Sequence, residues 1–523
     1  MDWKKSWTLP ALLTVAGACT IALVLPPNSA AKSHNSVASR GDALIMNSPP
    51  APKAMSAPGS KGTTTFSAAS NSSSAQLPDS FLGGVIEGYY GPPWSTADTV
   101  SMIAFLSQHH MNTFVYAPKY DPYERAKWNQ LYPQQNLMQL KTLVDASNRY
   151  HVQFVYSISP GLTITYGSAK DRQALVAKIN QIRALGVNVF MLSLDDIYHG
   201  LEGTDRQEYH GNMAFAQSSL ANYLLATELK ADPKFRLVMT PTNYHGMKDN
   251  PYWESLRVHL NKSVPVVWTG PGPGALSATI TSAEVETIQK YIGHPIVIWD
   301  NYPVNDYTYM QSHHPQLFMG PVVGRGPHLP SALAGYLFNP MIQARASEVA
   351  LWTGGDYLFH PSSYNPQASW MQAIKGIGGP AWQAFELFAD DSSTYYRNDT
   401  PPAKLAADVA AFWKEPGQAN LIHTPLYQDW MAMSQADTTL RLKLPDKSLY
   451  HEIEPWSHLL SMQGQAGMLA VAALERKREG KSVGPLVLQL QLRLATLQKD
   501  TDVIASDVAV QFVQQALSVL TAK

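Results

Sequence analysis

The 523-residue sequence has almost no cysteine and no excess of charge of either sign. Its one cysteine, Cys19, excludes a disulfide within the chain. Lysine and arginine number 39 against 40 aspartates and glutamates, which gives a formal net charge of −1. The sequence also has no basic stripe, and clustered basic residues are what neutralises nucleic-acid phosphates. We therefore expect neither a disulfide-stapled scaffold nor a nucleic-acid partner.

What the sequence does have is length, apolar residues and aromatic rings. Hydrophobic residues make up 45% of the chain, which is enough to fill a sizeable core. Single α/β barrels commonly have about 250 residues, so the chain has room for such a barrel and at least one further unit. The 13 tryptophans and 25 tyrosines offer ring faces of the kind that stack on sugars, although most are expected in the core.

The pattern of the N-terminal 78 residues indicates a targeting segment followed by a linker. Residues 1–31 begin with Lys4 and Lys5, continue as an apolar run and end in small residues. This pattern is typical of a secretory signal peptide, but the run is long enough to be an uncleaved membrane anchor instead. Residues 32–78 are rich in Ser, Ala and Pro, which predicts a disordered linker. We expect a secreted or extracytoplasmic protein whose membrane attachment, if it has any, is through this first segment only.

Residues 79–345 alternate strand-like and helix-like stretches. The strand candidates are short, rich in β-branched and aromatic residues, and show no clean alternation, as expected for parallel strands buried on both faces. They are Gly83–Glu87, Asn112–Tyr116, Gln153–Ser157, Val189–Leu194, Arg236–Thr240, Val264–Trp268, Pro295–Trp299 and Gly335–Phe338. Amphipathic stretches separate many of them: Thr96–Gln108, Leu137–Tyr150, Lys170–Leu185, Gly211–Leu229 and Ser282–Tyr291. Eight strands interleaved with helices predict an α/β fold, a (β/α)8 TIM-type barrel, although no helix is obvious after Trp299.

Residues 346–523 change to a purely helical pattern. Leu405, Val409 and Phe412 fall on one helical face, and long runs with helical periodicity extend from Trp456 to Arg478 and from Leu486 to Leu520. Strand signals are few. We expect an all-α C-terminal region that follows the catalytic barrel.

The chemistry is expected at the carboxyl ends of the barrel strands, where such barrels build their active sites. The fourth strand candidate ends in two adjacent carboxylates, Asp195 and Asp196. Neighbouring strand residues point to opposite faces, so this pair is poorly placed as the nucleophile and acid that flank one glycosidic bond. The pair suits substrate-assisted hydrolysis, in which one carboxylate holds the substrate's amide and the other protonates the leaving oxygen.

Two other interpretations of Asp195 and Asp196 stay open at this point. The carboxylates could cap the following segment or pair with a lysine at the rim. They could also bind a divalent cation, since carboxylates suit Mg²⁺ and Ca²⁺. No supporting cluster of ligands accompanies them in the sequence, and we expect neither a metal ion nor another cofactor.

Six segments at or near the strand ends carry a specific resemblance: Gly84–Trp94, Asn112–Lys119, Leu194–Ile197, Trp268–Pro271, Ile298–Tyr302 and Asn305–Tyr307. They resemble segments of the family 84 glycoside hydrolases, the β-N-acetylglucosaminidases that include the O-GlcNAcases. The resemblance extends over residues 80–345 and is highly specific there. It implies an exo-acting β-N-acetylglucosaminidase that retains configuration through an oxazoline intermediate, with GlcNAc-containing glycans or glycoproteins as substrates.

The same resemblance implies roles for individual residues. Asp195 would orient and polarise the 2-acetamido N–H, and Asp196 would act first as general acid and then as general base. Four residues would contact sugar hydroxyls or fix the non-reducing end: Gly88, Lys119, Asp306 and Asn339. Four others would surround the acetamido group: Tyr244, Thr269, Trp299 and Asn301. Each has a simpler structural interpretation, such as barrel core for Trp299 and Tyr244, a tight turn for Gly88 and a surface cation for Lys119.

Some features depart from the family pattern or leave alternatives. Tyr120 stands where relatives often carry an acidic residue, which bears on substrate preference rather than on catalysis. Glu87 is a second candidate acid, but we interpret it as a buried hydrogen-bonding support. The alternatives are therefore a retaining glycosidase that uses Glu87 without acetamido participation, and a non-catalytic sugar-binding barrel.

Overall fold

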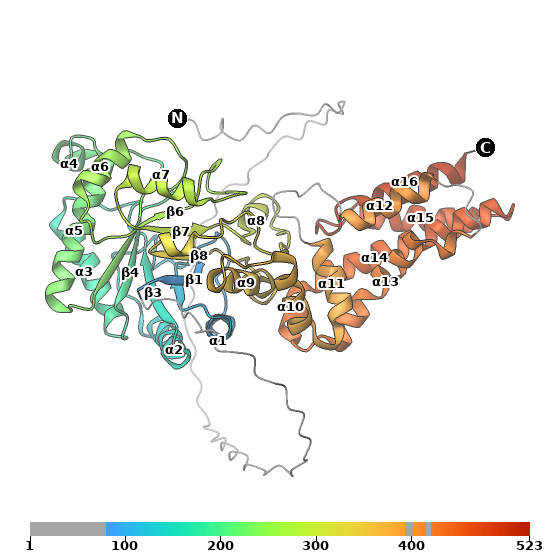
Figure 1. Ribbon diagram of the computed structural model, residues 1–523, viewed down its shortest axis with the longest axis horizontal. Coiled ribbons are helices and arrows are strands. Elements are labelled where there is room, and N and C mark those ends of the chain that lie inside the picture. The colour runs from blue at the N-terminus through green and yellow to red at the C-terminus, as the bar shows by residue number, and fades with distance from the viewer. Residues whose placement is uncertain (1–79, 393–401, 415–419, 523) are drawn as a thin grey trace, which may run out of the picture. The chain divides into compact units, whose positions relative to one another are not determined.

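The computed structural model describes residues 80–392, 402–414 and 420–522 (Figure 1). The predicted signal or anchor (1–31) and the linker (32–78) lie outside these residues. Within the described part of the chain, no helix combines the length and the apolar character that crossing a bilayer requires.

Among these residues, parallel strands close into a barrel in sequence order, with helices around them (Figure 1). The predicted (β/α)8 fold is confirmed. The strands are β1 (Leu82–Glu87), β2 (Thr113–Tyr116), β3 (Gln153–Ile158), β4 (Val189–Ser193), β5 (Arg236–Thr240), β6 (Val266–Trp268), β7 (Ile296–Asp300) and β8 (Gly335–Phe338). Almost every strand residue is buried, because the outer face packs on helices and the inner face fills the barrel.

The barrel helices follow the predicted amphipathic stretches to within a few residues. They are α1 (Thr96–Gln108), α2 (Gln134–Tyr150), α3 (Ala169–Arg183), α4 (Gly203–Glu208), α5 (Met213–Ala231), α6 (Pro251–His259), α7 (Ser282–Ile292) and α8 (Asp306–Ser312). The sequence did not reveal α4, α6 or α8, since helices this short show little more than two turns of periodicity. Local caps set the boundaries: Ser95 Oγ accepts the backbone N–H of Asp98, and Thr281 forms a capping box with Glu284.

The C-terminal region is helical throughout its described residues, as predicted. Its α-helices are α9 (Ala344–Phe359), α10 (Pro366–Gly378), α11 (Trp382–Asp391), α12 (Ala403–Lys414), α13 (Pro425–Lys443), α14 (Lys447–Arg478), α15 (Gly484–Leu497) and α16 (Val508–Thr521). Helix α9 contacts both β8 and α1, so the helices around the barrel continue past residue 345. Helices α13 and α14 approach each other closely where Gly467 faces Trp430. A Cβ atom on Gly467 would lie 2.3 Å from the Trp430 ring, so the packing there requires glycine.

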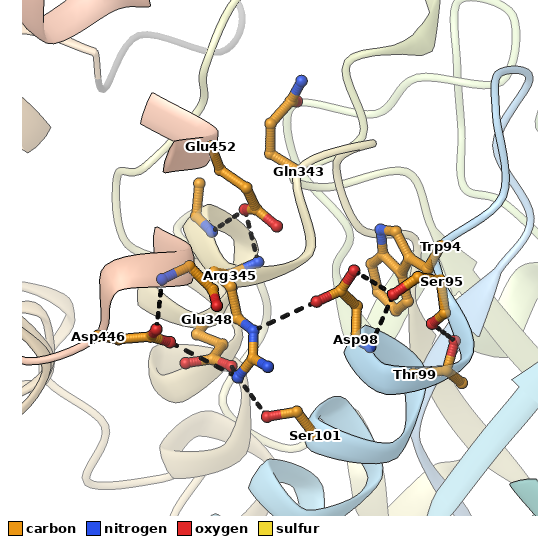
Figure 2. A network of polar contacts seen from close by, with 12 residues as sticks. Trp94, Ser95, Asp98, Thr99, Ser101, Gln343, Arg345, Glu348, Asp446 and Glu452 are labelled. Carbon is orange, nitrogen blue, oxygen red and sulfur yellow. Dashed lines mark hydrogen bonds and ion pairs between the residues drawn. The ribbon is translucent and has the colours of Figure 1, made fainter. Parts of the chain in front are cut away.

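A half-buried polar cluster joins α1, α9 and α14 (Figure 2). We call Asp98, Arg345, Glu348, Asp446 and Glu452 the junction network. The Glu452 carboxylate accepts the backbone N–H groups of Arg345 (2.8 Å) and Ala346 (3.0 Å), and so caps the N-terminus of α9 from another helix. The Arg345 guanidinium lies 3.5–3.6 Å from the carboxylates of Asp98, Glu348 and Asp446. The barrel and the helical region thus share one set of charges.

Candidate active site

The two adjacent aspartates follow β4 at the carboxyl end of the barrel. Leu194 still pairs with β5 through its N–H and the Thr240 carbonyl, at 2.8 Å. Asp195 is buried, whereas Asp196 is half-buried and has a φ of +55°. A left-handed conformation is uncommon for a residue other than glycine, and here it turns the chain between the two carboxylates. The pair therefore meets two separate sets of neighbours.

Asp195 forms a buried ion pair with Lys119, which follows β2 at the same end of the barrel. Both residues are less than 10% exposed. Burial alone raises the pKa of Asp195, but the Lys119 ammonium and then Arg125 outweigh it and leave that pKa below its usual value. The second oxygen of Asp195, Oδ1, has no hydrogen-bond partner among the described residues. The site thus presents an ionised carboxylate with a vacant acceptor atom.

Asp196 accepts hydrogen bonds from two phenols. The Tyr90 hydroxyl donates to Oδ2 at 2.6 Å, and the Tyr244 hydroxyl donates to Oδ1 at 2.9 Å. Burial and the neighbouring Asp196 charge raise the pKa of both phenols, so both stay protonated donors. Asp306 is connected to Asp196 through Tyr90: the Asp306 Oδ2 accepts the backbone N–H of Tyr90 at 2.9 Å.

A chain of amide contacts links the ends of β1, β7 and β8. The backbone N–H of Gly88 donates to Asn339 Oδ1 at 3.3 Å, and Asn339 Nδ2 donates to Asn301 Oδ1 at 2.9 Å. Asn301 in turn donates to the Ala275 carbonyl at 2.8 Å. These three predicted site residues are brought together, and their side chains are held in fixed orientations.

Trp299 belongs to an apolar cluster of barrel residues, and its ring explains the glycine at position 88. A Cβ atom on Gly88 would lie 2.2 Å from the Trp299 ring, which no real side chain tolerates. The Lys119 ammonium lies 5.4 Å from the centroid of the same ring. Thr269, after β6, donates its backbone N–H to the Tyr244 carbonyl at 2.8 Å and so fixes the loop that carries Tyr244.

Glu87 is 1% exposed and faces structural partners. Its Oε1 accepts the backbone N–H of Trp94 at 2.9 Å and lies 3.4 Å from the Tyr89 hydroxyl. Burial raises the pKa of Glu87 to about 8, so the group is neutral at pH 7. A neutral, buried carboxyl fits the support interpretation and is a poor nucleophile.

The geometry adds two residues that the sequence analysis did not single out, Tyr90 and Arg125. Tyr90 lies inside the Gly88–Gly91 motif, and only its neighbours were assigned roles. Arg125 lies in the segment after Lys119, where its guanidinium is 5.7 Å from the Tyr90 ring centroid. No cluster of three or more histidine, cysteine or acidic side chains suited to a metal ion occurs in the part of the chain that the structure describes.

Comparisons with known proteins show which family the chain resembles. Residues 83–390 match the family described as beta-N-acetylglucosaminidase, and residues 404–513 match a hyaluronidase post-catalytic domain-like family. The protein O-GlcNAcase of Rattus norvegicus is 33% identical over 308 residues, 58% of this chain and 32% of the relative. That of Mus musculus is 32% identical over 328 residues, 62% of this chain and 34% of the relative.

A solved structure shows that the likeness extends over both folded regions. A substituted form of the O-GlcNAc hydrolase of Thermobaculum terrenum has a TM-score of 0.74 and 28% identity, and the match covers 84% of this chain and 95% of that one. The chain spans about a third of the length of the two rodent relatives. Because the family match covers most of the chain, the protein belongs to the β-N-acetylglucosaminidase family of glycoside hydrolases, as its strand-end motifs indicated.

Proposed function

We propose that the protein is an exo-acting β-N-acetylglucosaminidase that removes terminal β-linked GlcNAc with retention through an oxazoline intermediate. The observation that carries this proposal is the asymmetric pair of acids. Asp195 is paired with a buried cation and keeps a vacant acceptor oxygen, whereas Asp196 receives two phenolic O–H donors. Two carboxylates in such different surroundings suit two different roles.

Asp195 would act on the substrate's own amide. In this proposal its Oδ1 accepts the acetamido N–H, which increases the electron density on the carbonyl oxygen. That oxygen attacks the anomeric carbon, the glycosidic C–O bond breaks, and an oxazoline ring forms. Since nucleophile and electrophile belong to one molecule, the attack gains a large effective concentration. The negative charge of Asp195 stabilises the positive charge that develops on the amide.

Asp196 would transfer the proton to and from the leaving side. In its protonated form it donates to the glycosidic oxygen, and as a carboxylate it then accepts a proton from the water that opens the oxazoline. The phenols of Tyr90 and Tyr244 hold the carboxylate in the second state. In the first state, the carboxyl rotates its O–H towards the leaving oxygen.

The other predicted residues would bind the sugar ring and its acetyl group. We assign Gly88, Lys119, Asp306 and Asn339 to the hydroxyls, and Tyr244, Thr269, Trp299 and Asn301 to the acetamido side. The substrates would be GlcNAc-containing glycans or glycoproteins. The N-terminal segment leads us to propose that the enzyme acts outside the cytoplasm.

A panel of chromogenic glycosides tests the proposal. We expect release of the chromophore from an aryl β-N-acetylglucosaminide and no release from the matching β-glucoside, which lacks the amide nucleophile. A thiazoline mimic of the intermediate should inhibit. Cleavage of both glycosides at similar rates, with indifference to the thiazoline, would establish a glycosidase without acetamido participation. Binding of the N-acetylglucosaminide without any release would establish a sugar-binding barrel.

A further inference from the structure

Arg125 is a buried cation that has no carboxylate partner at hydrogen-bond distance among the residues that the structure describes. It lies in the loop between β2 and α2 and is 9% exposed. Its Nη1 has no hydrogen-bond partner among the described residues. Its guanidinium carbon lies 5.7 Å from the centroid of the Tyr90 ring. A guanidinium carries five N–H donors, so burying one in this way is costly unless nearby groups stabilise its charge.

The charge of Arg125 is stabilised by Tyr90 and by three nearby carboxyl groups, two of which are the catalytic pair. Burial lowers the pKa of Arg125, but Tyr90, Asp195, Glu124 and Asp196 raise it more, and the net direction is upward. The interaction is mutual, because Arg125 follows Lys119 among the charges that lower the pKa of Asp195. The guanidinium also faces the ring whose hydroxyl donates to Asp196 at 2.6 Å. Arg125 therefore acts on both members of the acid pair, on Asp195 through charge and on Asp196 through Tyr90.

Two other arginines of the barrel show what a structural role looks like. Arg325 makes two hydrogen bonds to Asp300, at 2.6 and 2.8 Å. Arg183 on α3 donates to Glu228 on α5 at 2.8 Å. In each of these, the guanidinium donates directly to a carboxylate. The Arg125 guanidinium makes no such pair among the described residues, and its charge acts on the site instead.

We propose that Arg125 is a positioning residue for the catalytic pair: it holds the Tyr90 ring against Asp196 and supplies, with Lys119, the positive charge that keeps Asp195 ionised. This inference rests on the proposed function, since it concerns the ionised form of Asp195 that accepts the acetamido N–H. Arg125 contacts neither sugar nor leaving group in this scheme. Its effect reaches the reaction through the two acids.

The titratable groups around Arg125 determine which part of the pH profile shows the effect of Arg125 on Asp195. The titratable or charged groups that face it or its partners are Tyr90, Lys119, Glu124, Asp195, Asp196, Tyr198, Tyr244, His245 and Asp306. Burial raises the pKa of Glu124 to about 7, although the Ser157 and Ser159 hydroxyls donate to it. Asp195 titrates on the acidic side of its usual value. The pKa of Asp195 lies below its usual value and that of Glu124 lies above its usual value, so the ionisation of Asp195 belongs to the acidic limb of the pH profile.

The test is the pH dependence of kcat/KM on an aryl β-N-acetylglucosaminide for the full chain and four variants. Arg125→Met and Arg125→Gln remove the charge, Arg125→Lys keeps it, and Arg183→Met removes a structural arginine from the outer helices. Without the guanidinium charge the pKa of Asp195 rises, so the acidic limb moves to higher pH, by roughly one pH unit. At any pH on that limb, kcat/KM then falls about tenfold relative to the wild type. Arg125→Lys and Arg183→Met should keep the wild-type limb.

The outcomes separate this inference from the proposed function. An acidic limb that moves in the neutral variants and returns in Arg125→Lys supports the inference. An unmoved limb in folded Arg125→Met or Arg125→Gln overturns it, and so does loss of the folded state in both neutral variants, which would show a structural role. A wild-type chain that fails to release the chromophore would instead overturn the proposed function itself.

Discussion

The end of the barrel that carries Lys119, Arg125, Asp195 and Asp196, called the rim below, can be compared with the junction network. Both place several carboxylates beside few cations, yet the pKa of Asp195 at the rim is lowered, whereas carboxyl pKa values in the junction network are raised. At the rim, Lys119 and Arg125 hold the pKa of Asp195 below its usual value. In the junction network, burial dominates despite Arg345, and it raises the pKa of Glu348 to about 8 and of Glu452 to about 7. Asp195 at the rim therefore stays ionised at neutral pH, whereas Glu348 and Glu452 in the junction network hold their protons up to near-neutral pH or above.

The difference lies in the ratio of cations to carboxylates. Among the described residues of the junction network, Arg345 alone faces four acidic groups at distances of 3.5 Å or more or through backbone contacts. At the rim, Asp195 has a direct ion pair and a second cation nearby. A buried carboxylate ionises only when such partners offset its lost hydration. Activity and stability should therefore respond to pH through different residues.

The largest effect is expected from Asp196→Asn, which removes the proton donor at the rim. Cleavage of glycosides with poor leaving groups should fall by about 10²–10⁴-fold, because their departing oxygen must be protonated. Aryl glycosides with good leaving groups should lose much less. The ratio of kcat/KM for the two substrate types measures this, with Asp145→Asn on α2, an exposed position, as a folded control. Equal losses on both would argue against Asp196 as the acid.

Lys119→Met should come next, since it removes the direct counterion of Asp195. An unpaired buried carboxylate is costly, so its pKa rises and the ionised form is lost near neutral pH. We expect kcat/KM at pH 6 to fall about 100-fold, on the scale of roughly 3 kcal/mol for a broken buried pair. Lys141→Met, which removes an exposed pair with Asp145, is the matched control. A Lys119→Met variant as active as this control would show that Lys119 does not keep Asp195 ionised.

Glu452→Ala should leave the rim intact and weaken the junction. The variant removes the cap from the first N–H groups of α9, and lost helix caps cost about 1–2 kcal/mol. Chemical denaturation measures the free energy of unfolding, and kcat per folded molecule should stay unchanged. Glu454→Ala, an exposed site on the same helix, should have little effect on either quantity. A loss of kcat with unchanged stability would contradict the separation of the two networks.

The smallest effect is a pH-dependent gain from Glu348→Gln. The folded-state pKa of Glu348, about 8, lies above its unfolded value of 4.5, so the folded state binds the extra proton between these pH values. Stability from this group is complete below about pH 4.5 and declines as the pH rises to 8. The variant should therefore unfold at a higher temperature than the wild type at pH 8, and at nearly the same temperature at pH 5. A wild-type advantage at pH 8 would show that the Arg345 pair outweighs burial.

The sequence predicted the barrel and most of the site because both depend on short-range patterns. Apolar runs such as Val189–Leu194 mark buried strands, and residues at their carboxyl ends converge whatever the loops do. The structure accordingly brings Asp195 to Lys119 and Asn339 to Asn301 across long stretches of chain. Their chemical roles stay predictions until substrate is used.

The rest depended on backbone turns and long-range packing. Asp196, which accepts the Tyr90 hydroxyl, adopts a left-handed conformation that no pattern in the sequence indicated. Arg125 lies in a loop without periodicity. Glu452 caps a helix that begins more than a hundred residues earlier, and such a contact follows from packing rather than from local sequence.

The most direct test of the account is the rate of cleavage of aryl glucosaminides whose acetyl group carries zero, one, two or three fluorine atoms. Fluorine withdraws electrons from the amide oxygen and weakens it as a nucleophile, while the leaving group stays the same. We predict that log kcat/KM falls steeply and steadily with each fluorine, because each one weakens the amide oxygen that attacks the anomeric carbon. A flat series in the wild-type enzyme would contradict attack by the sugar's own amide.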